Sequence, residues 1–233
     1  MEYVQGLSHM NNLEVIYEDN HIIVVVKPPN VLSQKDSTND IDMLTLVKNY
    51  IKVKYNKPGN VYVGLVQRLD RPVGGLMVFA KTSKAASRMS NMIKNHQFTK
   101  KYLAVINGML ERKNGEFEDY LLKKENGTTI VSSNGKYCCL KYKVLEENLN
   151  MNLSLIEVDL ITGRHHQIRV QFASRNYPLY GDYRYGNSSN KQIALWAYKL
   201  SLIHPVLKKE MIFEKYPNIK DSAWKYFNEY FVK

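Results

Sequence analysis

The stretch that decides the fold is Gln67-Arg68-Leu69-Asp70-Arg71-Pro72-Val73-Gly74-Gly75. It joins two apolar runs, residues 61–65 and 76–80, whose β-branched and aromatic residues predict strands. The proline and the glycine pair between them predict a loop. Because nearby positive charge stabilises an anion, the flanking arginines favour the ionised form of Asp70. Asp70 is therefore a candidate nucleophile or base, although a surface ion pair that caps a turn would give the same pattern.

Composition predicts a globular chain with a basic surface. The 233 residues, 44% of them hydrophobic, are enough for one sizeable core. A net charge of +11 together with 17 tyrosines fits a nucleic-acid partner, and it fits an ordinary basic protein equally well. The longest apolar runs, such as residues 22–26, are too short to span a membrane. The first residues resemble neither a signal peptide nor a transit peptide, so we expect a cytoplasmic protein.

Hydrophobic periodicity predicts many strands and few helices. The predicted strands are residues 13–18, 21–27, 61–65, 76–80, 99–108, 117–122, 128–132, 137–145, 151–160 and 193–203. The predicted helices are residues 41–55, 84–95 and 165–175. This order indicates an α+β protein built on a mostly antiparallel, mixed sheet with a few flanking helices. We expect residues 1–12 to form an N-terminal arm and residues 13–233 to form one domain.

Two further clusters carry polar chemistry. Lys100-Lys101-Tyr102 opens a predicted strand, where the tyrosine could equally be a core residue. Residues 160–170, Leu-Ile-Thr-Gly-Arg-His-His-Gln-Ile-Arg-Val, turn into a predicted helix whose first N–H groups suit a phosphate. We expect no metal at the adjacent histidines, because neighbours on a helix point about 100° apart. The adjacent pair Cys138 and Cys139 likewise disfavours a disulfide and lacks metal-site spacing.

The three clusters together resemble the RluA-type pseudouridine synthases. Residues 67–76 are similar to the family signature HRLDRxTSGLLL, residues 100–105 to KxYLAV, and residues 160–170 to LxTGRTHQIRVHL. The opening Lys27-Pro28 pair also resembles the family, where its role is structural. The departures are Gln67 for histidine, Gly74 for serine and His165 for threonine. With these signatures in the family's order, the resemblance extends from residue 13 to residue 204.

The resemblance implies a pseudouridine synthase fold, with residues 13–233 as the catalytic domain. It implies isomerisation of uridine to pseudouridine in ribosomal or transfer RNA after the base is flipped out. Asp70 would be the nucleophile, Tyr102 would stack on the uracil, and Arg169 would pair with Asp70. Attack at C6 of uracil, attack at C1′ and a glycal route are alternatives. The implied RNA-binding residues are Arg68, Arg71, Lys100, Lys101, Arg164, His166 and Gln167.

The resemblance also bears on partners. We expect no metal and no cofactor, because the isomerisation is redox-neutral. With the core starting near Leu13, we expect no preceding RNA-binding module, RNA contacts from the core itself, and a monomer. The first alternative is a catalytically inactive RNA-binding protein or RNA-folding chaperone on the same scaffold. A metal-dependent nuclease is less favoured, since Asp70 stands alone among arginines rather than in a carboxylate cluster.

Overall fold

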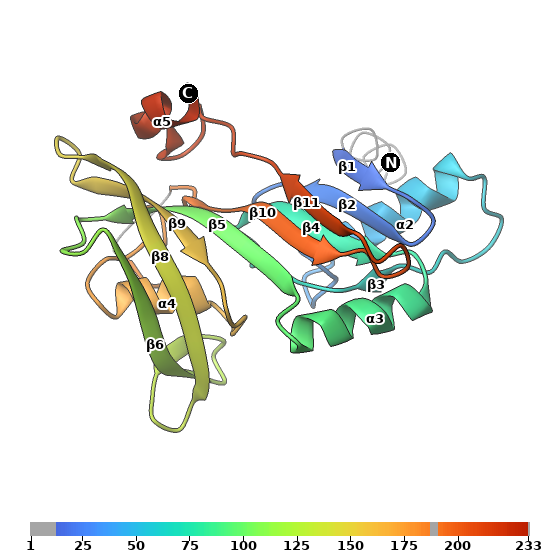
Figure 1. Cartoon of the computed structure of the whole chain (residues 1–233), viewed down its shortest axis with the longest axis horizontal. Helices are drawn as coiled ribbons and strands as arrows, with labels where there is room; N and C mark the ends of the chain where they lie inside the picture. The colour runs from blue at the N-terminus through green and yellow to red at the C-terminus, as the bar shows by residue number, and fades with distance from the viewer. Residues whose placement is uncertain (1–12, 187–190, 233) are drawn as a thin grey trace. The chain divides into compact units, whose positions relative to one another are not determined.

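The computed structural model describes residues 13–186 and 191–232 and divides into two compact units. Unit 1 contains residues 13–98 and 201–215, and unit 2 contains residues 99–200 and 216–232. The predicted arm, residues 1–12, lies outside the described residues. That residues 13–233 fold as one domain is still a prediction. Figure 1 shows the elements of both units along the chain.

The strands of unit 1 are antiparallel neighbours. β1 (Val15–Glu18) pairs with β2 (Ile22–Lys27), and β2 pairs with β4 (Gly74–Ala80), to which β3 (Gly64–Leu65) also pairs. Every residue of β2 and β4 is buried, as continuous apolar runs predict. β1 and β2 correspond to the predicted strands 13–18 and 21–27, and Asp19 closes the turn between them by accepting hydrogen bonds from the backbone of His21 and Ile22.

Two capped helices complete the core of unit 1. α2 (Met43–Lys54) begins at Asp42, whose side chain accepts a hydrogen bond from the Thr45 N–H at 3.0 Å. α3 (Ser83–Lys94) begins at Thr82 in the same way. Their buried faces are Met43, Val47 and Ile51 on α2 and Ala85, Met89 and Met92 on α3. The methionines of α3 therefore belong to the core.

Unit 2 contains five antiparallel strands whose order in the sheet differs from their order in the chain. Its strands are β5 (Phe98–Asn107), β9 (Leu153–Asp159), β8 (Lys136–Asn148), β6 (Asn114–Lys123) and β7 (Thr129–Val131), each paired with the next in this order. The helix α4 (Gln167–Ala173) packs on one face of them (Figure 1). Its Phe172 ring lies 5.0 Å from Phe117 of β6 and 5.9 Å from Tyr142 of β8, measured between ring centroids.

The α+β class and the antiparallel pairing confirm the prediction, but some boundaries differ. The helix predicted from residue 165 begins only at Gln167, because His166 has a left-handed backbone with φ of 54°. The predicted late strand is β10 (Leu195–Ile203), to which an unpredicted β11 (Glu210–Glu214) pairs. A 3-10 helix (Trp224–Phe227) and α5 (Asn228–Val232) were also not predicted. None of the described helices has the length and apolar character needed to cross a membrane.

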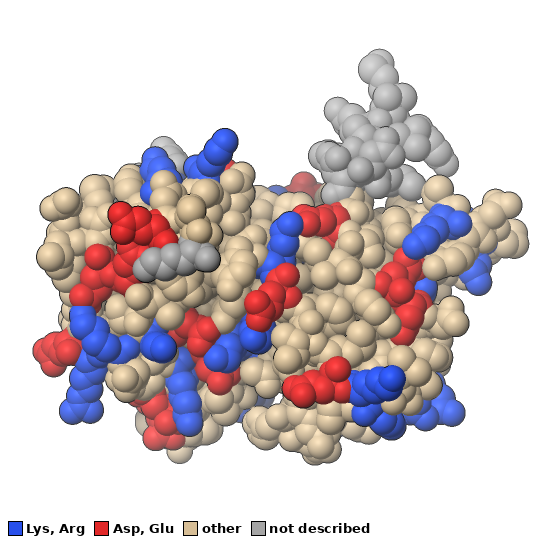
Figure 2. All heavy atoms as spheres, turned by 45° about the horizontal axis from the view of Figure 1, so that its top comes forward, with Lys and Arg blue, Asp and Glu red and all other residues tan. Residues whose placement is uncertain are grey.

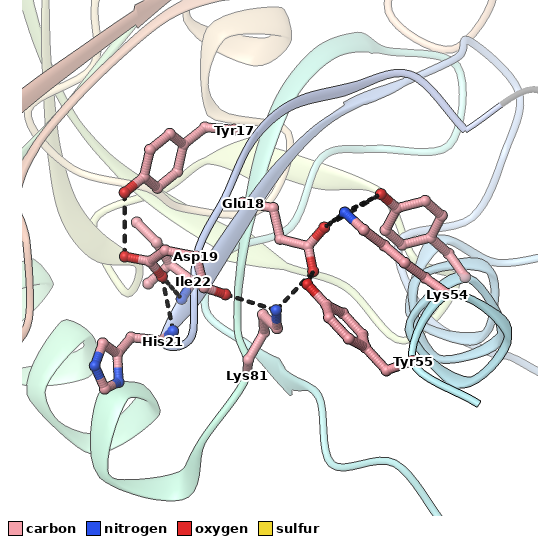
Figure 3. A network of polar contacts seen from close by, with 9 residues as sticks. Tyr17, Glu18, Asp19, His21, Ile22, Lys54, Tyr55 and Lys81 are labelled. Atoms are coloured by element: carbon pink, nitrogen blue, oxygen red, sulfur yellow. Dashed lines mark hydrogen bonds and ion pairs between the residues drawn. The ribbon is translucent and has the colours of Figure 1, made fainter. Parts of the chain in front are cut away.

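A buried carboxylate ties three elements of unit 1 together (Figure 3). Glu18, whose side chain is 5% exposed, ends β1 and receives hydrogen bonds from Lys54 of α2 and Lys81 after β4, both at 2.6 Å. Tyr55 donates a third at 2.9 Å. Burial alone would raise the pKa of Glu18, but these hydrogen bonds outweigh it and lower the pKa to about 2.

This network predicts acid sensitivity. Since the folded-state pKa of Glu18 lies below its ordinary value of 4.5, the ionised carboxylate stabilises the fold above that value. The contribution is lost as the pH falls towards about 2. We expect Glu18→Gln to lower the free energy of unfolding at about pH 6, and the difference from wild type to shrink steadily on acidification. Urea unfolding across this range measures it.

The matched control is Glu125→Gln, which changes an exposed side chain in the β6–β7 turn. It should leave the free energy of unfolding nearly unchanged at every pH. A Glu18→Gln difference that stays constant with pH would contradict the assignment.

Candidate active site

Asp70 lies on a short turn that leads into β4. Its backbone carbonyl accepts a hydrogen bond from the Val73 N–H at 3.0 Å, which closes the turn. Its side chain is half-buried, whereas the flanking Arg68 and Arg71 are exposed. The carboxylate therefore sits on a fixed backbone at the edge of the unit 1 core, with two guanidinium groups on the solvent side.

The residues around Asp70 are held by side chains from distant parts of unit 1. The hydroxyl of Ser33 donates to the Leu69 carbonyl at 2.7 Å and accepts from the Leu69 N–H at 3.0 Å. The ammonium of Lys27 donates to the Arg71 carbonyl at 2.9 Å and to the Pro28 carbonyl at 3.0 Å. Lys27 is 0% exposed. The sequence missed its closeness to Asp70, although a lysine at the end of an apolar strand was a visible signal.

Arg71 and Gln67 have different surroundings from those of Asp70. Arg71 makes an ion pair with Asp40 at 2.7 Å in which both side chains are 46% exposed. Gln67 is 8% exposed and donates from Nε2 to the Leu76 carbonyl at 3.2 Å. Its Oε1 is buried and has no hydrogen-bond partner among the described residues. The departure at position 67 thus leaves a polar atom unpaired three residues before Asp70.

Tyr102 lies in β5 of unit 2, on the face that α4 covers. It is opposite Val158 of β9, and Val158 is opposite Tyr142 of β8. Directly opposed residues in antiparallel strands share a face, and Tyr142 packs on Phe172 of α4. The structure therefore brings Tyr102 and the helix that carries Arg169 to the same side of the sheet, with Tyr102 buried.

The two lysines before Tyr102 lie on opposite faces of β5. The ammonium of Lys100 lies beside the turn at Gly163, where an added Cβ would be 3.3 Å from Nζ, and burial lowers the pKa of Lys100. Lys101, one residue on, belongs to the opposite face and forms an ion pair with Glu157 at 2.8 Å. The geometry groups Lys100 with the turn before α4 and does not group Lys101 with Tyr102.

The turn before α4 is built around Gln167. This side chain is 3% exposed and accepts hydrogen bonds from the Arg164 N–H at 3.0 Å and the Thr162 hydroxyl at 2.8 Å. It donates to the Cys139 carbonyl and to Gln171. Gln167 is thus engaged inside unit 2 and holds the Arg164 N–H, while phosphate binding by the first N–H groups of α4 is still a prediction. Arg164 itself is exposed and its Nε donates to the Tyr137 carbonyl.

The two histidines precede the helix instead of lying on it. Their rings stack with centroids 3.7 Å apart, so the argument that they diverge around a helix was wrong. Nδ1 of His165 meets the Thr129 hydroxyl and Nδ1 of His166 meets the Tyr185 hydroxyl. Burial, with the positive charges of Arg169, Arg184 and Lys123 nearby, lowers the pKa of His166 to about 2, so the imidazole is neutral. Arg184 and Lys123 belong to none of the sequence clusters, so their place near His166 was not predicted.

Arg169 is fixed by a buried ion pair within unit 2. Its Nε and one terminal nitrogen donate to the two oxygens of Asp182 at 2.8 and 2.6 Å, and the side chains are 2% and 0% exposed. The guanidinium also lies over the Tyr185 ring, 5.1 Å from its centroid. The loop at 181–186 therefore orients Arg169. Asp70 belongs to unit 1 and Arg169 to unit 2, and their pairing is still a prediction.

One group of possible metal ligands occurs on the outer face of β6 and β8. The ligand atoms of Glu116, Glu118 and Cys139 all lie within 4.8 Å of one another. The Cys139 thiol donates to Glu116 at 2.8 Å, and burial together with that carboxylate raises the pKa of Cys139 to about 12. Within this cluster the structure shows a hydrogen bond from the thiol to a carboxylate.

The surface charge is mixed where it can be viewed. On the face that Figure 2 shows, lysines and arginines alternate with acidic side chains. The net charge of +11 therefore does not appear there as one continuous basic field. Individual basic residues such as Arg68, Lys100 and Arg164 are stronger indications of an anionic partner than the net charge of the chain.

Several known proteins are similar to this chain in sequence or in fold. A model of the RNA pseudouridylate synthase family matches residues 21–174. An uncharacterised RNA pseudouridine synthase of Bacillus subtilis, YhcT, is 32% identical over 214 residues, which cover 89% of this chain and 70% of the relative. This chain belongs to the RNA pseudouridylate synthase family. It is an RNA pseudouridine synthase, an enzyme of the isomerase class.

Other relatives of the synthase agree. The ribosomal large subunit pseudouridine synthase C of Rickettsia felis is 31% identical over 225 residues, covering 94% of this chain and 70% of that protein. The structure of human RNA pseudouridylate synthase domain containing 4 superimposes with a TM-score of 0.79 at 20% identity, covering 99% of this chain and 98% of that one. This second likeness shows that the fold is shared.

The Arg169–Asp182 pair predicts a large stability effect. Asp182→Ala leaves the Arg169 charge buried without its carboxylate, and removing one partner of a buried pair costs about 3–5 kcal/mol. Asp40→Ala, which breaks the exposed pair with Arg71, should cost less than about 1 kcal/mol. Urea unfolding of both variants gives the comparison. Equal costs would show that the buried pair does not stabilise unit 2.

Proposed function

We propose that this synthase isomerises uridine to pseudouridine in ribosomal or transfer RNA with Asp70 as nucleophile. The feature that carries the proposal is the Asp70 turn, where exposed arginines flank a half-buried aspartate and where Ser33 and Lys27 hold the backbone on either side of it. Rickettsia relatives named for the ribosomal large subunit make ribosomal RNA the first substrate to examine. Such a substrate would place the enzyme in the cytoplasm, and we expect it to act as a monomer.

The isomerisation changes few bonds in the nucleotide. The bond from C1′ to N1 of uracil breaks, a bond from C1′ to C5 forms, the proton on C5 leaves and N1 gains one. Electrons balance within the nucleotide, so we expect no cofactor and no metal. In this proposal Asp70 attacks the flipped nucleotide, Tyr102 stacks on the uracil, and Arg169 pairs with Asp70. A flipped base is read most readily in a pocket that stacks and excludes water.

The remaining residues serve RNA binding in this proposal. Arg68 is exposed, and its planar guanidinium suits the gap that a flipped base leaves in the stack. Arg71, Lys100, Arg164 and His166 would contact phosphates or sugars, with His166 acting as a neutral group. We leave Gln167 and Lys101 out, because the one is buried in the α4 turn and the other is paired with Glu157 on the opposite face.

The first experiment tests the nucleophile. RNA from cells lacking this gene, labelled with tritium at C5 of uracil, is incubated with wild type, Asp70→Asn and the control Asp36→Asn. Pseudouridine formation releases the tritium to water. We expect release by wild type and Asp36→Asn, and a loss of at least about 10³-fold in Asp70→Asn with RNA affinity unchanged, as when a nucleophile is removed.

Two outcomes contradict the proposal differently. Equal release by Asp70→Asn and wild type means that another group is the nucleophile. Absence of release by wild type on every RNA fraction, together with tight binding, favours an RNA-binding protein or folding chaperone without catalysis.

A second prediction concerns phosphate contacts. Arg164→Gln should weaken binding to all RNA sequences alike and reduce the slope of log affinity against log salt by about 1, because one counterion fewer is released. Fluorescence anisotropy across a salt series measures the slope. Lys220→Gln, which removes an exposed charge outside the proposed surface, should leave the slope unchanged. An unchanged slope in Arg164→Gln would remove this residue from the RNA interface.

A further inference from the structure

Two exposed tyrosines lie next to each other on the outer face of β6 and β8, the face turned away from α4. Tyr120 of β6 is directly opposite Tyr137 of β8, and Figure 1 shows the two strands side by side. Their chain neighbours Leu121 and Cys138 pack with Val170 of α4, and successive side chains of a strand point to opposite faces. The two rings therefore belong to the outer face, where they are 51% and 42% exposed.

Both rings are held by their neighbours. Their centroids lie 5.9 Å apart with the ring planes at 69°, which is an edge-to-face contact. The Tyr137 hydroxyl also donates a hydrogen bond to the Glu118 carboxylate on the same face. A ring that is already oriented loses little conformational freedom when another flat group stacks on it. The pair is therefore a preformed aromatic surface that is exposed to solvent.

The chain that joins the two rings is basic. Residues 121–136 contain one acidic residue, Glu125, and three exposed lysines, Lys123, Lys124 and Lys136. Arg184 is anchored to the same segment, because its guanidinium donates to the Gly127 carbonyl at 3.0 Å. Exposed rings beside cations are the combination that binds single-stranded nucleic acid, because bases stack on the rings while the phosphates meet the charges.

The rings are also continuous with the proposed RNA interface. Arg164 is exposed, and its Nε donates to the Tyr137 carbonyl at 2.9 Å, so the guanidinium lies at the edge of β8 beside that residue. The acidic side chains of this face, Glu116 and Glu118, precede Tyr120 on β6. Because they repel phosphates, they direct the RNA backbone to the side of the lysines and Arg164.

We propose that Tyr120 and Tyr137, the tyrosine platform, bind unpaired bases of the substrate RNA by stacking, while Arg164 and the lysines of residues 121–136 bind the adjoining phosphates. This rests on the proposed RNA interface at Arg164, and it adds a property of the substrate. The bases of a duplex are stacked inside the helix, whereas those of loops can be splayed out onto aromatic rings. The platform therefore selects RNAs that contain single-stranded nucleotides besides the target uridine.

The first test measures stacking through affinity. The probes are a fluorescein-labelled oligouridine of about ten nucleotides, within the usual site sizes of stacking proteins, and an RNA duplex of the same length. Tyr120→Ala and Tyr137→Ala should each weaken oligouridine binding about 5- to 150-fold, as the loss of one base–aromatic stack does, and change duplex binding less than about twofold. Fluorescence anisotropy across a salt series measures both. The salt slope should stay that of wild type, since no charge is removed.

Two control variants separate stacking from damage to the fold. Tyr137→Phe keeps the ring and loses the hydrogen bond to Glu118, and it should bind oligouridine within about threefold of wild type. Tyr62→Ala removes a tyrosine of unit 1 that is 49% exposed, and it should bind as wild type does. Equal oligouridine affinities in wild type, Tyr120→Ala and Tyr137→Ala would overturn the proposal.

A second test uses only the wild-type protein, so it does not depend on the folding of a variant. Oligouridine that contains 5-bromouridine is bound and irradiated with ultraviolet light. The C5–Br bond of the uracil breaks, C5 bonds to a stacked aromatic ring, and HBr is released. Trypsin places the two tyrosines in different peptides, residues 114–123 and 137–141. We expect cross-links in both peptides, and cross-links confined to other peptides would overturn the proposal.

The outcomes separate this surface from the reaction that it serves. If the alanine variants lose oligouridine binding while wild type releases no tritium from any RNA fraction, the platform stands and the proposed reaction fails. If wild type releases tritium and both alanine variants bind and react as it does, the reaction stands and the platform fails. If wild type does not bind oligouridine but sediments as a dimer that Tyr120→Ala dissociates, the rings cover a contact between two copies, and the proposal is overturned.

Discussion

Residues 66–73, which carry Asp70, lie outside the strands that the structure describes, and this constraint shapes unit 1. Buried peptide groups need hydrogen-bond partners, so side chains take the place of a sheet neighbour. The Ser33 hydroxyl serves both polar groups of Leu69, and Lys27 serves the Arg71 carbonyl. These anchors come from residues far away in sequence, and Lys27 lies in β2, which pairs with β4. The backbone beside Asp70 is therefore held by contacts of the completed fold.

Unit 2 likewise uses side chains to bind buried backbone groups, here mainly amides. Gln167 and Gln171 of α4 donate to the carbonyls of Cys139 in β8 and Phe117 in β6, and Gln171 also donates to Asp119. Arg175 then pairs with Asp119 at the end of the helix. A seven-residue helix has little intrinsic stability, and this buried network, together with Phe172, supplies what its length lacks. Arg169 is directed by a helix that its neighbours hold in place.

Much of the fold was predictable because its signals are local. The signals lie within a few residues of the elements they define. They are the apolar runs of β2 and β4, the helix caps at Asp42 and Thr82, and the turns between strands of unit 2. The late segments β11 and the 3-10 helix at Trp224 were missed, because a short strand or turn depends on tertiary partners more than on its own pattern. The left-handed conformation of His166 was missed for a similar reason, since no glycine marks it.

The elements that carry the candidate site residues were predictable, and the surroundings of these residues were less so. Motif order placed Asp70, Tyr102 and Arg169 on the right kinds of element, and the shared face of Tyr102 and α4 follows from strand register. The hydrogen-bond and ion-pair partners could not be predicted from sequence. Examples are the pairing of Arg169 with Asp182, the buried position of Gln167, and the contact of Lys27 with the Asp70 turn. These are contacts between residues far apart in sequence, and they depend on packing.

The two cysteines have a practical consequence for studying this enzyme. Cys138 and Cys139 are both buried, and burial raises the pKa of their thiols to about 11 and about 12. Only the thiolate reacts with maleimides and other alkylating dyes, so the folded protein is nearly inert to them at neutral pH. A cysteine introduced at an exposed position becomes the dominant site of labelling. The native sequence is therefore a ready background for attaching single fluorophores or spin labels to follow RNA docking.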